Sequence, residues 1–269
     1  MKNSASRRPV INQRRAYFEC RYGQLHVRTA FPSTGGFDEL TPLVCLHESP
    51  RSSASFGAFL PAMATDRSVY ASDLPGHGES DPTVDAPSIG DYAAAIGDFL
   101  DALRLREADV LGIGTGAATA VELAVARGPA IRRVVLAQLP LGAETPVAVP
   151  APSEDGRHLA AAWVHGRSVR GSDEPLERFA QGYAEELSQG RRAVWGPAAA
   201  AAWPGRDRLR LVVQPLLVLR PGRAQPDTAA ATRDAVPKAV FRDHPASGAA
   251  LFHLEAAAVA DEVRAFLGR

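Results

Sequence analysis

The 269-residue sequence has little cysteine and no excess charge of either sign. Its two cysteines, Cys20 and Cys45, lie in extended or apolar stretches, where a free thiol usually packs as a small hydrophobic side chain. No group of cysteines and histidines has the spacing of metal ligands, so neither a metal nor another cofactor is expected. Lysines and arginines number 30, as do aspartates and glutamates, so neither nucleic acid nor an anionic membrane is an expected partner.

Long apolar runs are absent as well. No stretch approaches the roughly 18 uninterrupted apolar residues of a membrane span, and no apolar segment of the signal-peptide kind opens the chain. The expected location is therefore the cytoplasm. Apolar residues still make up 46% of the sequence, which is enough for a sizeable core in one large α/β domain.

Strand and helix patterns alternate along most of the chain. Residues 15–29 predict a hairpin, and the continuous apolar run 42–47 predicts a buried parallel strand. Further strands are expected within 68–82, 109–113, 131–142, 214–222 and 238–244, and helices at 88–105, 114–124 and 254–267. This alternation indicates a doubly wound, mostly parallel sheet with helices on both faces.

One region departs from that alternation. From 143 to 207 the sequence begins with three prolines between 146 and 152, which break regular structure, and continues with helical segments that contain all three tryptophans. The alanine-rich tract 198–203 is typical of helix rather than of disorder. We therefore expect an α/β core formed by residues 1–142 and 208–269, with residues 143–207 inserted as a helical cap.

A serine is missing from a place that has the pattern for one. The stretch DVLGIGTGAATAVELA, residues 109–124, runs from an apolar strand through G-x-x-x-G into an alanine-rich helix. In a nucleophile elbow, G-x-S-x-G, the middle residue is the catalytic serine. Here the middle residue is Gly114, which has no side chain to attack a substrate.

Taken in order, these segments resemble the α/β-hydrolase fold over nearly the whole chain. LHESP at 46–50 matches the family's His-Gly turn after the third strand, and DLPGHGESD at 73–81 matches the loop after the fourth. GIGTG at 112–116 falls at the elbow, and PLLVL at 215–219 at the strand that precedes the family's acid. Within the family, the chain is similar to a bacterial subgroup whose elbow often reads G-H-H-T-G, so its elbow is degenerate.

The resemblance implies a Ser–His–acid triad, whose three positions can be examined in turn. The nucleophile position is Gly114, and the window for the acid, 220–224, contains no carboxylate; Asp227 follows a few residues later. The histidine position falls on Ala249, with His244 and His253 on either side. We therefore expect that the hydrolytic triad is not in use.

A neighbouring residue could replace the serine, so a hydrolase with a rewired triad stays open. Thr115 is adjacent but its side chain should point away from the reacting position, and Cys45 lies inside a strand. Ser49 and Ser80 lie on loops, and Ser80 is typical of a turn.

The elbow can still stabilise negative charge without a side chain. The resemblance implies that the backbone N–H of Thr115 forms half of an oxyanion hole, and that the loop after His47 forms the other half. Glu48 follows His47 where many family members have glycine, which would direct a carboxylate toward the pocket floor. A buried carboxylate without a cation has a raised pKa that suits proton transfer. The alternative is that Glu48 turns outward or pairs with Arg51.

Candidate substrate-binding residues come from both the core and the cap. Trp163 and Arg167 are four residues apart in an expected helix, so with His158 they could share one face and bind a planar or acidic substrate. Ordinary cap packing with a surface arginine is the alternative. The candidate set is His47, Ser49, Ile113, His158, Trp163 and Arg167.

The function expected from these residues is cofactor-free acid–base chemistry on a small apolar organic substrate. A dehydration, isomerisation, cyclisation or lyase step would use Glu48 as proton carrier and the Thr115 N–H to stabilise negative charge. Composition typical of a GC-rich bacterial genome suggests specialised metabolism. The alternative is a catalytically dead protein that binds a small molecule or has a structural role, and a homodimer is compatible with either. A buried Glu48 carboxylate would favour chemistry, and an exposed one the inactive protein.

Overall fold

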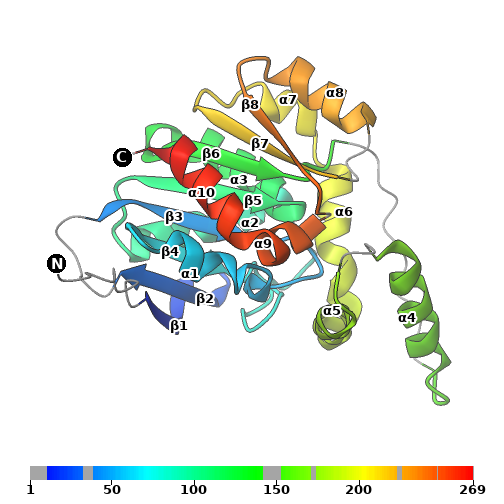
Figure 1. Ribbon diagram of the computed structural model, residues 1–269. Helices are drawn as coiled ribbons and strands as arrows, with labels where there is room; N and C mark the ends of the chain where they lie inside the picture. Colours follow the sequence, from blue (N-terminus) through cyan, green and yellow to red (C-terminus); the bar gives the residue numbers. More distant parts are fainter. Residues whose placement is uncertain are drawn as a thin grey trace, which may run out of the picture.

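The protein is an eight-stranded, mostly parallel sheet covered by helices on both faces (Figure 1). The computed structural model describes residues 11–32, 39–141, 153–170, 174–222, 226–246 and 248–268. The strands are β1 (Ile11–Cys20), β2 (Gly23–Pro32), β3 (Leu40–Leu46), β4 (Arg67–Ser72), β5 (Ala108–Ile113), β6 (Ile131–Ala137), β7 (Leu216–Pro221) and β8 (Val240–His244). Their order across the sheet is β1-β2-β4-β3-β5-β6-β7-β8.

The direction of the strands follows the length of the connections between them. β1 and β2 form the predicted antiparallel hairpin, and β2 is antiparallel to β4, whereas all pairs from β4 to β8 are parallel. Parallel neighbours need crossover connections, and most of these contain helices. The predicted doubly wound sheet is therefore confirmed.

The helices divide between the two faces of the sheet. They are α1 (Phe59–Met63), α2 (Ile89–Ala102), α3 (Thr115–Arg127), α4 (Arg157–Val169), α5 (Leu176–Gln189), α6 (Trp195–Ala202), α7 (Gly205–Leu209), α8 (Pro226–Ala235), α9 (Leu251–Leu254) and α10 (Ala256–Leu267), with short 3₁₀ turns η1 (Ser53–Phe56), η2 (Gly128–Ala130), η3 (Gly190–Val194) and η4 (Gly248–Ala250). α2 and α3 pack on one face, and α1, α9 and α10 on the other.

Strand periodicity produces these two cores. Val44 and Leu46 of β3 are buried on the α2–α3 face, and Leu43 and Cys45 on the α1–α10 face. Successive side chains of a strand point to opposite faces, so a strand covered on both sides must be apolar throughout. This explains why 42–47 has no polar alternation.

Local capping fixes the predicted helix at 88–105. Ser88 accepts a hydrogen bond from the Asp91 N–H, and the Asp91 carboxylate accepts one from the Ser88 N–H. This reciprocal pair satisfies two N–H groups at the start of α2. The predicted terminal helix, 254–267, differs slightly, because it breaks at Glu255 into α9 and α10. The Glu255 carboxylate there accepts a hydrogen bond from the Ala246 N–H.

The helical insertion lies between β6 and β7 and consists of α4, α5, α6 and α7. The alanine-rich tract 198–203 lies largely in α6, as predicted, while the proline-rich segment falls outside the described residues. α5 and α6 lie at the carboxyl ends of the central strands, and α4 lies beyond α5 (Figure 1). The boundaries 1–142, 143–207 and 208–269 stay predictions.

Buried charges gather at the opposite, amino end of the strands. Asp109 of β5 is fully buried, and its Oδ2 lies 2.6 Å from Arg132 Nη2 and 3.7 Å from Arg67 Nη1. The same two arginines donate to the last described carbonyls of the chain, Arg132 to Leu267 at 2.9 Å and Arg67 to Gly268 at 3.1 Å. The charges therefore hold the end of α10 against the sheet.

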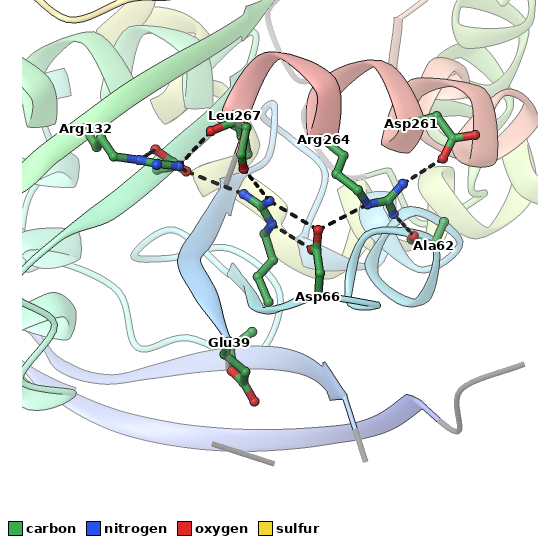
Figure 2. Close-up of polar contacts among 11 residues, drawn as sticks. Glu39, Ala62, Asp66, Arg132, Asp261, Arg264 and Leu267 are labelled. Carbon is green, nitrogen blue, oxygen red and sulfur yellow. Dashed lines mark hydrogen bonds and ion pairs between the residues drawn. The ribbon is translucent and has the colours of Figure 1, made fainter. Parts of the chain in front are cut away.

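A second set of contacts extends this network, as Figure 2 shows. Arg264 of α10 donates to the Ala62 carbonyl at 2.7 Å and pairs with Asp261 at 2.7 Å and with Asp66 at 3.6 Å. Asp66 also accepts a hydrogen bond from Arg67 Nε at 2.9 Å. We call the residues Asp66, Arg67, Asp109, Arg132 and Arg264 the amino-edge network.

None of the helices in the described ranges has the length and apolar character needed to cross a membrane.

Candidate functional site

The strand order indicates where in the sheet a binding site should form. β3 leads to β4 on one side, but the next strand in the chain, β5, lies on the other side of β3. In open α/β sheets, ligands bind at such a reversal, outside the carboxyl ends of the strands. Leu46 of β3 and Gly112 of β5 are paired in register there. The segments that follow them, which contain Glu48 and Gly114, are therefore brought side by side.

Gly114 forms the sharp turn expected of the elbow. It follows β5, precedes α3, and has φ 55° and ψ −122°, a conformation that side-chain-bearing residues rarely adopt. A Cβ at this position would lie 2.8 Å from the Glu48 Cβ and 3.8 Å from its Oε2. Glu48 thus occupies the space toward which a side chain at position 114 would project.

Gly116 brings the start of α3 against the end of β3. A Cβ on Gly116 would lie 2.1 Å from the Leu46 carbonyl oxygen and 2.6 Å from that of His47. Any larger residue would therefore push the helix away from the segment between β3 and α1, residues 47–58, which we call the Glu48 loop. The G-x-x-x-G pattern is explained by this close approach.

Thr115 is the first residue of α3. An N–H at that position has no acceptor inside its own helix, and the helix dipole adds partial positive charge there. The Thr115 side chain is buried and its carbonyl accepts a hydrogen bond from Thr119. The arrangement can bind negative charge at the elbow without any contribution from a side chain.

His47 is fully buried and fixes the loop that carries Glu48. Its Nε2 accepts a hydrogen bond from the Leu74 N–H at 2.9 Å, so its proton resides on Nδ1, which donates to the Glu48 carbonyl at 2.8 Å. Burial lowers the pKa of His47, which keeps the ring neutral. This ring positions the Glu48 backbone and has no exposed surface for a substrate.

Ser49 forms a hydrogen bond with His77 that resembles a nucleophile–base pair. Their Oγ and Nε2 atoms are 2.7 Å apart, and His77 Nδ1 lies 3.2 Å from the Pro75 carbonyl, which identifies Nε2 as the acceptor. Burial lowers the pKa of His77 to about 3, so its ring is a poor base. Gly196 of α6 covers the serine, because a Cβ there would lie 2.4 Å from Ser49 Oγ.

Charged residues from α5 face the Glu48 loop. Arg178 donates to the Ser55 carbonyl at 3.3 Å, and its pKa is lowered mainly by burial. The Arg51 guanidinium lies against Gly182, which leaves room for it on α5. Burial raises the pKa of Glu185, which hydrogen-bonds to Ser52. The cap therefore supplies both charge signs to the site.

The residues near the expected triad histidine have other partners. His244 lies between two carboxylates of the C-terminal region, with Nδ1 3.0 Å from Glu255 and Nε2 2.8 Å from Glu262. His253 lies on α9 and is largely exposed. Its pKa is lowered, first by partial burial and then by the charge of Arg178.

The positions expected for the histidine and the acid lie in short helical elements or just after β7. Ala249 belongs to η4, and Asp227 to α8. In the acid window, Arg220 pairs with Asp243 at 2.7 Å, while residues 223–224 lie outside the described residues.

The cap residues predicted to bind substrate make contacts within the cap. Trp163 packs against Phe179 and Tyr183 of α5, with ring centroids 4.8 and 5.2 Å away. His158 Nδ1 accepts a hydrogen bond from the Ser153 N–H at 3.0 Å, which closes the turn before α4. Arg167 is exposed. The pairing of α4 with α5 thus determines the direction of the tryptophan.

Ile113 also lies away from the site, because its side chain is fully buried in the α1–α10 core. Among the described residues, no group of three or more His, Cys, Asp or Glu side chains is arranged to hold a metal ion.

Sequence and structure comparisons agree with this architecture. The family model described as "Alpha/beta hydrolase family" matches residues 43–262, most of the chain. The protein belongs to the α/β-hydrolase family. The predicted fold class is therefore confirmed. A search of curated proteins gives no significant sequence match.

Solved structures similar to this α/β-hydrolase protein cover nearly all of it. An enol-lactonase from Burkholderia xenovorans has a TM-score of 0.73 at 19% identity, over 94% of this chain and 99% of its own. A hydrolase from Pseudomonas aeruginosa has a TM-score of 0.73 at 22% identity, over 99% and 100%. A haloalkane dehalogenase loop variant from Bradyrhizobium elkanii has a TM-score of 0.69 at 17% identity, over 95% and 96%. At these identities, the similarity establishes the fold alone.

Sequence reasoning overlooked Arg51 and Arg178 as site residues. The sequence indicates Arg51 only as a possible partner for Glu48 and gives no local pattern that marks Arg178. The signal for Arg178 was weak, because it is 130 residues away from Glu48 in the chain (178 − 48) and reaches the site through the packing of α5. Only the GIGTG and LHESP motifs, with their fixed relation to strand ends, could have located the site.

Proposed function

We propose that this protein is a cofactor-free, non-hydrolytic enzyme that moves a proton on a small, largely apolar organic substrate, and that it works without a Ser–His–acid triad. One observation carries the proposal. The Glu48 side chain lies in the space that a side chain at Gly114 would fill, next to the N-terminus of α3. A carboxylate thus replaces the nucleophile of a hydrolase at the elbow.

The reaction begins when the Glu48 carboxylate takes a proton from the carbon next to a substrate carbonyl. The C–H bond breaks, an O–H bond forms on Glu48, and the electron pair moves to the carbonyl oxygen as an enolate. The Thr115 N–H and the dipole of α3 stabilise that oxygen. Glu48 then returns the proton to a different atom, which completes an isomerisation, or to a leaving group, which completes a dehydration or lyase step.

The surroundings of Glu48 support proton transfer over inert binding. The residue is half-buried rather than exposed, and His47 holds its backbone through the carbonyl. Gly114 makes room for it through the absence of a Cβ. A geometry fixed by hydrogen bonds and packing is what a catalytic acid or base requires.

The experiment uses proton exchange, because the natural substrate is not needed for it. Phenylpyruvate and phenylacetone are incubated with the protein in D₂O, and deuterium incorporation at the enolisable carbon is followed by NMR. Wild type should accelerate exchange in at least one of them. Glu48→Gln should lower that rate about 10²–10⁴-fold, the usual contribution of a positioned acid or base. Glu48→Asp should lie between the two.

Three outcomes would contradict the proposal. Equal exchange by wild type and Glu48→Gln would remove Glu48 from the mechanism. A stoichiometric adduct of Ser49 with a serine-directed phosphonate, seen by mass spectrometry, would favour a hydrolase with a relocated nucleophile, the activity that the hydrolase names of the similar structures suggest. If both carbonyl compounds bind and neither exchanges, the protein is a binding protein.

A further inference from the structure

Two arginines near Glu48 differ in their partners from the arginines at the amino end of the sheet. Arg51 and Arg178 are both half-buried at the junction of the cap and the Glu48 loop. Neither forms an ion pair with any carboxylate in the described part of the chain, whereas arginines at the amino end of the sheet pair with aspartates.

Arg178 has most of its hydrogen-bonding capacity left. A guanidinium has five N–H donors in a planar fork, and the described residues provide one acceptor, the Ser55 carbonyl at a long 3.3 Å. Burial is the main influence on the pKa of Arg178 and lowers it; Glu174 raises it and Arg51 lowers it. An anion beside this group would compensate for the water that burial removes.

Arg178 lies close enough to Glu48 for their charges to interact. Its charge interacts with Glu48 on the loop after β3 and with His253 on α9. The guanidinium also donates to the Ser55 carbonyl in η1, which follows Glu48 along the chain. A ligand whose reacting carbon is at Glu48 could therefore reach Arg178 with its other end.

We propose that Arg178, assisted by Arg51, binds a carboxylate group of the substrate, so that the substrate is a small organic carboxylic acid with an enolisable carbon. The inference deepens the proposed function and rests on it for the position of the reacting carbon. A guanidinium fork matches a carboxylate with two parallel hydrogen bonds.

Charge balance favours a single negative charge on the ligand. The charge of Arg178 interacts with the carboxyl groups of Glu174, Glu185 and Glu48, and that of Arg51 with Glu185. A doubly charged group such as a phosphate monoester would meet stronger repulsion from these acids than a carboxylate would.

The test compares phenylacetate with phenylacetamide, which has nearly the same shape and no charge. Isothermal calorimetry on the whole protein should show at least tenfold tighter binding of phenylacetate. Arg178→Met should remove that preference, while binding of phenylacetamide stays within about twofold. Arg178→Lys should restore part of the preference, because it keeps the charge but loses the fork. Arg210→Met, which removes an exposed arginine paired with Asp207, is the control and should not change either affinity.

The Glu48→Gln variant separates this inference from the proposed function. It should bind phenylacetate as tightly as wild type or a few-fold more tightly, because it removes a negative charge near the ligand, although it has lost proton exchange. Retained preference with unchanged exchange would overturn the proposed function alone. Equal binding of the acid and the amide, absence of phenylacetate binding, or a preference that persists in Arg178→Met would overturn the inference.

Discussion

The arginines at the two ends of the central strands differ in whether they have a carboxylate partner. At the amino end, Asp109 is fully buried and has two arginine partners, Arg67 and Arg132, which also bind the end of α10. At the carboxyl end, Arg51 and Arg178 are half-buried and form no ion pair with any described residue. Arg67 and Arg132 thus have a carboxylate partner within the protein, whereas Arg51 and Arg178 have none among the described residues.

The difference separates a structural role from a binding role. Removing one member of a buried ion pair is costly, because the remaining charge is left without water or a partner. The amino-edge network therefore fixes one geometry. An arginine that lacks an anionic partner is an unfavourable element of the folded protein, but it is available to a ligand. The unfavourable charge and the candidate binding site therefore lie at the same end of the sheet.

The largest effect is expected from breaking the amino-edge network. Asp109→Asn keeps the size of the side chain but leaves Arg67 and Arg132 without their shared charge. Unfolding by urea should show a loss of about 3–5 kcal/mol. Asp207→Asn, which breaks the exposed pair with Arg210, should cost less than about 0.5 kcal/mol. A loss below about 1 kcal/mol for Asp109→Asn would mean that the two ends do not differ in this way.

A smaller effect is expected on how the free energy of unfolding depends on pH, through a histidine at the carboxyl end of the strands. His77 is buried with a pKa of about 3, below its ordinary value, so the unfolded chain binds the proton more readily than the folded one. Stability is then complete above about pH 6.5 and falls as the pH decreases from there toward 3. Between pH 7 and pH 5, this histidine should account for a loss of about 2 kcal/mol.

The measurement is urea unfolding of wild type and His77→Gln at both pH values. The variant should lose about 2 kcal/mol less than wild type over this interval. His47, whose pKa is also lowered by burial, should still contribute in both proteins. Parallel pH profiles would show that folding does not lower the pKa of His77.

The smallest effect concerns the elbow itself. Gly114→Ser places a side chain on a residue with φ 55°, and its Cβ would lie 2.8 Å from the Glu48 Cβ. The free energy of unfolding should therefore fall by about 1–2 kcal/mol. Glu48→Gly in the same chain should recover part of that loss. A double-mutant cycle from thermal unfolding measures the coupling. Additive changes would contradict the close contact, and ester hydrolysis should not appear in either variant, because position 249 is alanine.

The sequence predicted the sheet better than the cap. Buried parallel strands are apolar throughout, and the helix at 88–105 carries its own cap residues, so each element could be identified from adjacent residues. Gly114 and Glu48 could be placed together because both follow strands of known order. Trp163 could not be oriented, since its direction depends on Phe179 and Tyr183, which belong to another helix.

The same limitation applied to the charges of the site. Arg178 meets the Glu48 loop through a hydrogen bond that spans 123 residues, and the Ser49–His77 contact spans 28. Contacts of this kind depend on how the cap helices sit on the strands, and no short motif records that arrangement.

The contact between positions 48 and 114 also constrains how such a site can arise by mutation. A side chain at 114 and one at 48 compete for one volume, since their Cβ atoms would be 2.8 Å apart. A variant with long side chains at both positions must move the loop after β3 or the start of α3. A mutational path to this pair therefore meets the least steric conflict when position 114 is glycine before a longer side chain appears at position 48.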